Sequence, residues 1–395
     1  MEYRYDYLIV GAGMAADAAA KALRESAPDA TIGIVGDEPH PPYERPPLSK
    51  GLWKEKPVDS VDLGTVRGGA VLHLRRHAVA LDRVARQVSD DHGDTYTYRR
   101  LLLATGATPR KLPFSGDRII HFRTLDDFVA LRKLATPAAR IVVVGGGFIG
   151  SELAAALTMV GCKVTLVFPG DVIGAGRFPA RLADFLTAFY RERGVDVRNG
   201  VRVRSGAQRD DGVHLELDDG TTLCADAVVA GLGVLPNTAL GEQAGLKVDN
   251  GVTVDEHLRS SDPEIFAAGD VANFHNAALQ LRLRVEHENA AIGMGHVAGR
   301  VMAGLDATYN TLPFFYSDLF EFGYEAVGLL DDRLDVVEQW SEPYREGIVY
   351  YLDNGRVRGV LLWNTWGQVE AARDLIAAPG PFDAENVRGR LPRLA

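Results

Sequence analysis

The chain has 395 residues, of which 46% are hydrophobic and 24% are charged, so it is long enough for two or three globular domains. This composition excludes disordered and fibrous proteins. No apolar run reaches the roughly 18 to 20 residues that a membrane-spanning helix needs, so we expect no membrane span. The formal net charge of -10 argues against nucleic-acid binding, because phosphate backbones attract basic surfaces.

The two cysteines, Cys162 and Cys224, match no CxxC or metal-binding spacing. We therefore expect neither a disulfide framework nor a metal site. So few cysteines fit a reducing compartment, and a strand-like run close behind Met1 leaves no room for a signal peptide. These features predict a cytoplasmic protein.

Charge is unevenly distributed along the chain. Residues 67–123 contain an excess of Arg and Lys, whereas residues 309–395 contain an excess of Asp and Glu. A solvated surface is the simplest explanation. The basic stretch could also steer an acidic partner toward the protein.

One pattern occurs twice: an apolar strand, a glycine-rich turn and an alanine-rich helix, at residues 7–16 and 141–150. Each copy is followed by a second apolar strand, at 31–35 and 163–168. This arrangement is typical of doubly wound α/β folds and predicts two dinucleotide-binding units.

Other segments alternate with period two and are separated by turn residues. They predict small antiparallel sheets near residues 79–98 and 195–227. From about residue 309 the chain is aromatic, free of lysine and rich in strands, and a helix is expected at 368–377. This segment predicts a third domain of antiparallel strands plus helix.

The first glycine motif contains Gly11, Gly13 and Ala16. The first glycine permits the tight turn, the second lets the backbone approach a pyrophosphate, and the small third residue lets helix and strand pack. The acidic pair Asp37 and Glu38 follows the second strand, where a ribose hydroxyl partner belongs. The motif therefore predicts a dinucleotide site.

Two further strands end in small-residue turns, at Thr105-Gly106 and at Gly269-Asp270. Together with both glycine motifs in this order, they resemble the two-dinucleotide flavoprotein oxidoreductases, in which FAD and a nicotinamide cofactor occupy separate Rossmann units. The resemblance implies that Asp270 holds the ribityl chain of FAD, and that Thr105, Gly106 and Gly269 lie at the same cofactor.

The resemblance also implies the architecture. It predicts an α/β fold with two Rossmann-like dinucleotide-binding domains, for FAD and NAD, plus a C-terminal α+β domain. The FAD-binding domain is expected in two segments, at 1–112 and 238–308, on either side of an NAD(H)-binding domain at 113–237. The C-terminal domain is expected at 309–395.

The loop at residues 42–53 is stiffened by prolines and carries the cations Arg45 and Lys50. It is similar to the loop along FAD in ferredoxin reductases and apoptosis-inducing factors, which implies that Arg45 contacts the adenosine side and Lys50 lies near the flavin ring. Related disulfide reductases carry a cysteine pair after the first ribose acid, and some oxidases a single cysteine. This sequence has neither, so we expect no redox-active thiol.

The second motif, with Gly145, Gly147 and Gly150, should hold the pyrophosphate of NAD(H) or NADP(H). Glu152 lies in the first turns of the following helix, where the helix dipole alone would favour a carboxylate. The resemblance implies a sharper role, in which Glu152 pairs with Lys50 beneath the flavin N5.

The choice of nicotinamide cofactor depends on the residues after the second strand of that unit. The strand ends in Phe168, and Asp171 could still reach the ribose diol, whereas Arg177 would favour a 2'-phosphate. The Leu-x-Phe-Pro pattern is similar to apoptosis-inducing factors, which prefer NADH. We therefore expect NADH ahead of NADPH, with Gly233 a further cofactor contact.

Three C-terminal blocks resemble the apoptosis-inducing-factor branch, including its prokaryotic relatives: residues 284–290, 315–326 and 362–364. The resemblance implies that Glu286 and His287 border the flavin and nicotinamide, and that the helix they open points at the flavin. It also implies that Phe315 and Tyr316 form an aromatic shelf, for which core burial is the alternative. The death signalling and DNA binding of animal members are not expected here.

The expected function is an FAD-dependent NADH oxidoreductase that passes a hydride to flavin and electrons to an external acceptor such as ferredoxin, rubredoxin or a small molecule. The residues expected to act in catalysis are Lys50, Glu152, His287 and Tyr316. Two alternatives remain open: a redox-sensing protein with slow NADH oxidation and a stable charge-transfer complex, and an NADH oxidase. A small iron-sulfur protein is the expected partner, and a homodimer is left open.

Overall fold

The computed structural model describes residues 1–391 and divides the chain into two compact units. Unit 1 contains residues 1–45, 57–108 and 235–312, and unit 2 contains residues 46–56, 109–234 and the chain from 313 onward. Within the described residues, no helix is long and apolar enough to cross a membrane. The finer division into an NAD domain and a C-terminal domain, both within unit 2, stays a prediction.

Unit 1 is built on a seven-stranded sheet. Its strands, in spatial order, are β3 (Val71–Leu74), β2 (Ile32–Gly36), β1 (Glu2–Val10), β6 (Thr95–Leu103), β5 (Gln87–Asp90) and β4 (Ala78–Asp82), with β18 (Ile265–Ala267) also paired to β6. The small sheet expected near residues 79–98 is therefore not separate. Strand β6 pairs with β1 in parallel along its length, while its other edge is shared by β5 and then β18.

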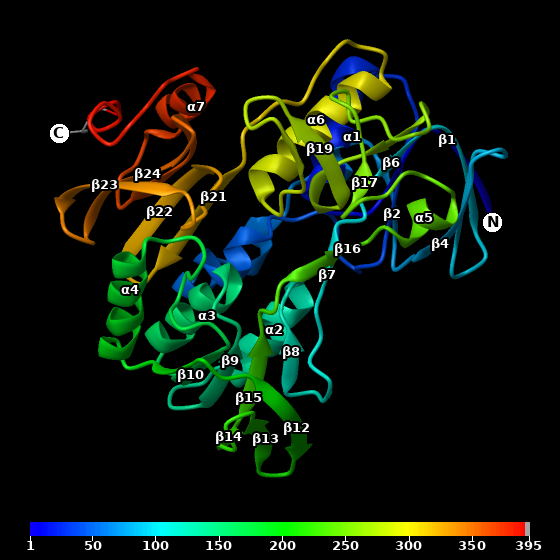
Figure 1. The fold of residues 1–395 in the computed structure, drawn as a ribbon. Coiled ribbons are helices and arrows are strands. Elements are labelled where there is room, and N and C mark those ends of the chain that lie inside the picture. Colours follow the sequence, from blue (N-terminus) through cyan, green and yellow to red (C-terminus); the bar gives the residue numbers. More distant parts are fainter. Residues whose placement is uncertain (392–395) are drawn as a thin grey trace. The chain divides into compact units, whose positions relative to one another are not determined.

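Two helices of unit 1, α1 (Met14–Ser26) and α6 (Glu288–Met302), lie side by side (Figure 1). Glycines make this approach possible, because a Cβ at Gly295 would lie 2.3 Å from the carbonyl oxygen of Ala15. A Cβ at Gly299 would lie 2.5 Å from that of Ala19. The helix after the first glycine turn is thus packed against the helix after the Gly-Asp turn.

The remaining elements of unit 1 are short. They are the 3-10 turns η3 (Val58–Val61), η4 (Thr65–Gly68) and η5 (Gly269–Val271), the helix α5 (Ala239–Gln243), and the strands β17 (Val252–Thr253), β19 (Ala272–Asn276) and β20 (Leu281–Leu283). Two further strands, β7 (Ala107–Pro109) and β16 (Val234–Pro236), carry the chain across the division between the units.

Unit 2 contains a five-stranded parallel sheet with helices in the connections. Its strands, in spatial order, are β11 (Asp196–Asn199), β10 (Lys163–Phe168), β9 (Arg140–Val144), β15 (Ala227–Ala230) and β8 (Ile119–His121). The helices are α2 (Leu125–Leu134), α3 (Phe148–Met159) and α4 (Ala180–Glu192). The loop at 46–56, with turns η1 (Pro46–Ser49) and η2 (Gly51–Lys54), also belongs to this unit.

Two antiparallel sheets complete unit 2. The first contains β12 (Val203–Arg209), β13 (Gly212–Leu217) and β14 (Thr222–Ala225), so the expected antiparallel region is shorter than residues 195–227. The second has the order β21 (Phe314–Leu319), β22 (Phe322–Gly328), β25 (Arg356–Trp363), β24 (Glu346–Asp353) and β23 (Asp335–Glu342), followed by α7 (Val369–Ala377). The mixed α/β class is confirmed, and α7 lies where a last helix was expected.

Candidate active site and cofactor-binding residues

The first glycine turn has the geometry that a bound pyrophosphate requires. Gly11 has φ +107°, and a Cβ there would lie 2.0 Å from the carbonyl oxygen of Ala104, so no other residue fits. Around Gly13, in contrast, a Cβ would meet nothing within 4 Å, and Ala16 is fully buried. The amino end of α1 is thus open beside a backbone without side chain, which fits a phosphate group.

The second glycine turn repeats this geometry in unit 2. Gly145 has φ +117°, and its Cβ would lie 2.3 Å from the carbonyl oxygen of Gly231. A Cβ at Gly147 would meet nothing within 4 Å, whereas one at Gly150 would lie 1.8 Å from the oxygen of Gly145. The amino end of α3 therefore also fits a pyrophosphate.

An ion-pair network follows β2 in unit 1. Glu38 Oε1 lies 2.5 Å from Arg45 Nη2, and the Tyr43 hydroxyl donates to Glu38 Oε2 at 2.6 Å. Burial lowers the pKa of Arg45, but electrostatic interactions with Tyr43, Glu38 and Asp270, together with the hydrogen bond to Glu38, outweigh burial and raise the pKa above its ordinary value. Asp270, from the Gly-Asp turn, therefore acts electrostatically on the same guanidinium as Glu38.

The two members of the acidic pair lie in different surroundings. Glu38 contributes to the network just described, whereas Asp37 is exposed and lies 3.1 Å from the ring of His77. Between the two, Glu38 is the better placed to meet a ribose beside Arg45. For Asp37 the structure supports only a surface contact.

Arg284 is a residue to which the sequence analysis assigned no role. Its side chain is 9% exposed, its Nη1 donates to the carbonyl oxygen of Asp270 at 3.1 Å, and its Nη2 lies 2.7 Å from Glu286. Within residues 1–391, its buried Nε has no hydrogen-bond partner. A buried donor without an acceptor in the protein fits a site completed by a bound group.

His287 is positioned at the start of α6. It is the N-cap residue, and its Nδ1 accepts a hydrogen bond from the backbone N–H of Asn289 at 3.2 Å. This contact orients the imidazole at the helix end. A cofactor contact of His287 stays a prediction.

The turn after β6 is held by Asn237, another residue that the sequence analysis missed. The Asn237 amide donates to the carbonyl oxygen of Thr105 at 2.8 Å, and the Thr105 hydroxyl donates back to the Asn237 carbonyl at 2.8 Å. The backbone N–H of Asn237 also donates to Gly106. In the second turn, Gly269 lies close to Ala15, to which its Cβ would come within 3.2 Å.

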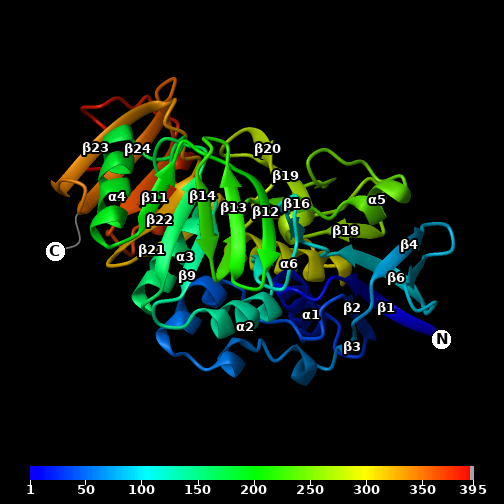
Figure 2. The same ribbon diagram turned by 90° about the horizontal axis from the view of Figure 1, so that it is seen from below.

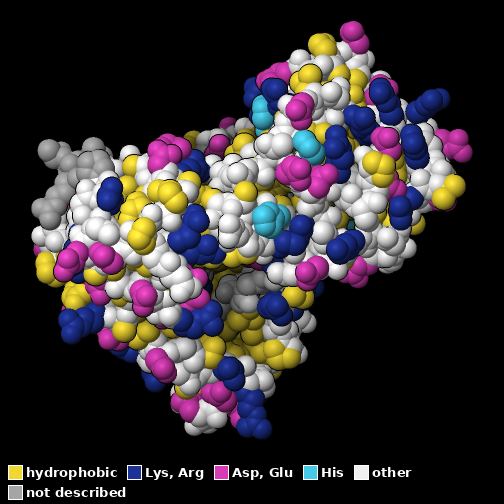
Figure 3. Space-filling view, turned by 45° about the horizontal axis from the view of Figure 1, so that its top comes forward, with side chains coloured by type: hydrophobic (Ala, Val, Ile, Leu, Met, Phe, Trp, Pro, Cys, Tyr) yellow, Lys and Arg dark blue, Asp and Glu magenta, His cyan; other side chains and the backbone are white. Residues whose placement is uncertain are grey.

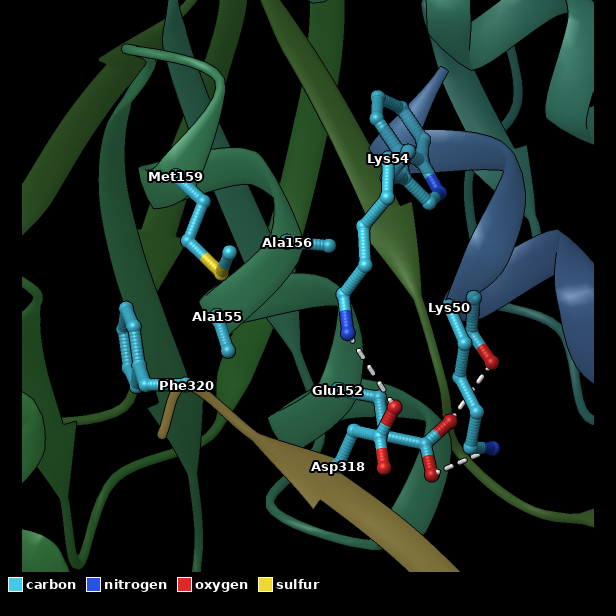
Figure 4. Close-up of a pocket in the computed structure, with 10 residues that line it drawn as sticks. Lys50, Lys54, Glu152, Ala155, Ala156, Met159, Asp318 and Phe320 are labelled. Carbon is cyan, nitrogen blue, oxygen red and sulfur yellow. Dashed lines mark hydrogen bonds and ion pairs between the residues drawn. The ribbon is translucent and has the colours of Figure 1, made fainter. Parts of the chain in front are cut away.

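A buried cluster surrounds Glu152 in unit 2 (Figure 4). Glu152 is 3% exposed, and its Oε1 lies 2.7 Å from the ammonium nitrogen of Lys50. The hydroxyls of Ser49 and Ser317 donate to Oε2 and Oε1, each at 2.6 Å. The structure thus contains the pair that the resemblance implied, and adds two serines that the sequence analysis did not identify.

The Glu152 cluster has aromatic neighbours. The Lys50 ammonium lies 5.0 Å from the ring centroid of Tyr316. Burial, with the negative charge of Glu152 as a further cause, raises the pKa of Tyr190 and Tyr324. Both phenols therefore stay protonated at neutral pH.

A pocket beside the Glu152 cluster has about 340 Å³ of empty space, some of it open to solvent. Lys54 and Asp318 form a second, more exposed ion pair there, at 3.4 Å (Figure 4). This pair shares the pocket but not the hydrogen bonds of Glu152.

Phe315 contacts the second glycine motif. Its ring stacks on Phe148, the first residue of α3, with centroids 5.8 Å apart, and the guanidinium of Arg177 lies 4.3 Å from the Phe148 centroid. Phe315 is only half-buried, so the structure supports packing within unit 2 rather than full core burial. Arg177 is directed at an aromatic face, where it gains a cation–π contact.

The carboxyl end of β10 carries no acidic residue. The ring of Phe168 lies against the second glycine turn. A Cβ at Gly146 would come within 2.7 Å of this ring. Asp171 is exposed, and its carbonyl oxygen accepts from Asn199. Gly233, beyond β15, is also exposed and has φ +78°. Both residues stay predicted cofactor contacts.

Two family models match the sequence. Residues 5–295 match the model described as pyridine nucleotide-disulphide oxidoreductase. Residues 337–378 match the model described as apoptosis-inducing factor, mitochondrion-associated, C-term.

Individual relatives match over nearly the whole chain. The ferredoxin–NAD(+) reductase component of the anthranilate 1,2-dioxygenase system of Burkholderia cepacia is 35% identical, with 96% of each chain covered. Mitochondrial apoptosis-inducing factor 1 of Dictyostelium discoideum is 31% identical, with 94% of this chain and 78% of the relative covered.

A solved structure, the covalent putidaredoxin reductase–putidaredoxin complex, matches with a TM-score of 0.89 and 32% identity, covering 94% of this chain and 93% of that chain. The chain therefore belongs to the pyridine nucleotide-disulphide oxidoreductase family, in the branch of apoptosis-inducing factors and ferredoxin reductases, and it is an oxidoreductase that uses FAD and NADH.

Proposed function

We propose that this chain is a ferredoxin reductase, which oxidises NADH and delivers electrons to a small iron-sulfur protein. The relative named as a ferredoxin–NAD(+) reductase component and the solved putidaredoxin reductase–putidaredoxin complex support this acceptor class. Within the structure, the observation that carries the proposal is the organisation of α3. Its amino end presents the open turn at Gly147, and Glu152, on the same helix, fixes the ammonium group of Lys50.

Flavin, when bound, accepts a hydride and releases electrons singly. The chain's own residues are expected to bind the cofactors and to orient the charged groups beside them. Glu152 accepts hydrogen bonds from Ser49 and Ser317, so its carboxylate cannot rotate away from Lys50. This preorganised cation is the group that we expect to stabilise negative charge during hydride transfer.

The Glu152→Gln variant tests this role. The glutamine oxygen still accepts hydrogen bonds but lacks the charge, so we expect the rate of flavin reduction by NADH to fall about tenfold or more. Asp318→Asn is the matched control, because it removes the partly exposed partner of Lys54 in the same pocket. Stopped-flow measurement of flavin absorbance would give both rates, and equal rates in the two variants would remove Glu152 from the mechanism.

The acceptor is tested by turnover with a panel of carriers. We expect fast reduction by NADH and fast reoxidation by a ferredoxin. Slow reduction, with an air-stable long-wavelength band, would instead favour the redox-sensing alternative. Rapid oxygen consumption without a carrier would favour an NADH oxidase.

The basic stretch at residues 67–123 does not form one surface within a single unit, because the chain passes from unit 1 to unit 2 after residue 108. Arg76 lies near Asp90 and Asp94, at 3.7 and 3.5 Å, whereas Arg75 is exposed. On the face in view in Figure 3, basic side chains are interspersed with acidic ones. We therefore propose local rather than global steering of an acidic partner.

Arg75→Glu is the cleaner test of such docking than any change at Arg76. It should slow the ferredoxin-linked rate by about two- to fivefold at low salt, with the difference fading at high salt. The rate with a small neutral acceptor serves as the internal control. A ferredoxin rate that does not respond to Arg75→Glu would reject docking at this position.

The expected cytoplasmic location and a homodimer stay predictions.

A further inference from the structure

The strands β12, β13 and β14 of unit 2 form a three-stranded sheet (Figure 2), one face of which packs into a hydrophobic cluster. Val213, Leu215 and Leu217 of β13 pack into a buried cluster with Val142 and Val228 of the parallel sheet. Because successive side chains of a strand alternate between faces, the residues between them point to the other side. His214 is one of these.

Three potential metal ligands meet on that outer face. His214 is paired with Cys224 across the β13–β14 ladder, and Asp211 lies in the turn before β13. The His214 Nε2 is 2.8 Å from Asp211 Oδ1 and 3.8 Å from Cys224 Sγ. The ligand atoms all lie within 4.8 Å of one another, the one such group of three among residues 1–391.

The geometry differs from that of a nucleophilic cysteine with a histidine base. In a catalytic triad, the acid and the nucleophile bind opposite nitrogens of the imidazole. Here the carboxylate and the thiol both approach the same nitrogen, Nε2. An oxygen, a nitrogen and a sulfur atom within 4.8 Å of one another form a set that a single metal ion can bind.

We propose that Asp211, His214 and Cys224 bind one divalent transition-metal ion, with zinc as the ion that best suits their chemistry. Zinc accepts thiolate, imidazole and carboxylate ligands, and its ligand atoms lie roughly 3.3–3.6 Å apart in a tetrahedral site. The two separations from His214 Nε2, 2.8 and 3.8 Å, differ from these values by about 0.5 Å or less. The third, between Asp211 and Cys224, lies within 4.8 Å and needs a shift below about 1.5 Å. Three protein ligands leave a fourth position for water.

The surroundings are compatible with a cation. The Asp211 side chain is exposed, and its carboxylate offers an oxygen ligand beside the imidazole and the thiol. Arg140 also approaches Cys224, but its guanidinium is paired with Asp226 at 2.7 Å. The Asp226 carboxylate therefore balances the charge of this guanidinium.

The separation of the two cysteines in the sequence did not indicate this site. The pairing of β13 with β14 brings His214 beside Cys224, and the turn before β13 contributes Asp211. A metal at this place would link the turn before β13 to β14, and it would stabilise unit 2 by an amount that grows with the logarithm of free metal over Kd.

The test uses the full FAD-loaded chain without a polyhistidine tag, treated with a chelator and then titrated with Zn²⁺ by calorimetry. We expect one zinc per chain. Cys224→Ser and His214→Gln should each weaken binding at least about tenfold. Asp210→Asn, which changes the neighbouring exposed acid, should bind zinc as the unchanged chain does. Binding that is absent, or that persists undiminished in Cys224→Ser, would overturn the proposal.

A second measurement uses the unchanged chain, so it does not depend on whether the substituted chains fold. Alkylation of the unchanged chain, followed by mass spectrometry, measures the reactivity of each cysteine. Zn²⁺ should slow labelling of Cys224 at least about tenfold, with buried Cys162 as the internal reference. Labelling of Cys224 at the same rate with and without Zn²⁺ would contradict the site.

Discussion

The two glycine turns share one backbone geometry but differ in the side chains beyond them. Gly11 and Gly145 both have strongly positive φ and lie against a carbonyl oxygen, and both are followed by an open position. After β2, however, Glu38 and Arg45 form a charged network, whereas β10 ends in the ring of Phe168. We therefore expect the backbone to hold a phosphate group in both units, and the residues after the second strand to determine which ligand each unit binds.

The largest effects are expected at the two glycines with positive φ. The methyl group of Gly11→Ala would lie 2.0 Å from a carbonyl oxygen, and that of Gly145→Ala would lie 2.3 Å from one. We expect each to lower the free energy of unfolding by about 2–4 kcal/mol. Urea unfolding and FAD content per chain would measure this.

The two variants are expected to lose the function of different cofactors. Gly11→Ala should lose FAD, whereas Gly145→Ala should keep FAD and lose reduction by NADH. A Gly11→Ala protein with full FAD content would show that the first turn does not hold this cofactor.

Substitution at the open positions separates ligand binding from folding. Gly13 and Gly147 have φ of -102° and -82°, which alanine adopts, and their added Cβ would meet no atom within 4 Å. Both variants should fold normally. The methyl group would enter the space for the pyrophosphate, so we expect affinity to fall about 10- to 100-fold, for FAD in Gly13→Ala and for NADH in Gly147→Ala.

Fluorescence titration of FAD into the apoprotein and the KM for NADH give these two values. If both variants affected the same cofactor, the assignment of one cofactor to each unit would be wrong.

The glycine turns could be predicted because their signal is local: strand, turn and helix follow one another within a few residues. Strand pairing is not local. The strands near residues 79–98 show the alternation of an antiparallel sheet, but nothing in that segment indicates that β6 continues along β1. The antiparallel strands near residues 79–98 are therefore confirmed, but they extend the seven-stranded sheet and do not form a small sheet of their own.

The site was predicted to the extent that its residues belong to recognisable motifs. Lys50 and Glu152 were paired through the family resemblance, and the structure contains the ion pair. Asn237 comes from a segment with no motif of its own. Arg284 and Ser317 lie in the blocks at 284–290 and 315–326, but only folding shows that they contact Asp270 and Glu152. Ser49 lies in the loop at residues 42–53, but a serine in a loop does not by itself indicate its hydrogen-bond partner.

A smaller effect is expected from the charged network that distinguishes unit 1. Glu38→Gln removes the charge that holds Arg45, and because the pair is partly exposed, we expect FAD affinity to fall only about three- to tenfold. Asp37→Asn is the control at the adjacent exposed acid. Equal losses in both variants would restore the view that the acidic pair acts as one.

The smallest effect concerns protonation in unit 2. His121 accepts a hydrogen bond from the backbone N–H of Leu112 at 2.9 Å, and burial, assisted by the charge of Lys111, lowers its pKa from 6.5. The unfolded chain therefore binds this proton more readily than the folded chain. The contribution to stability is complete above pH 6.5 and is lost as the pH falls through the lower folded-state pKa.

The His121→Gln variant keeps an acceptor but cannot be protonated, so the fall in Tm between pH 7.5 and 5.5 should shrink by a few degrees at most. His73 in unit 1, whose pKa burial also lowers, would sustain the remaining slope. An unchanged pH slope in His121→Gln would show that this imidazole is not among the groups that weaken unit 2 in acid.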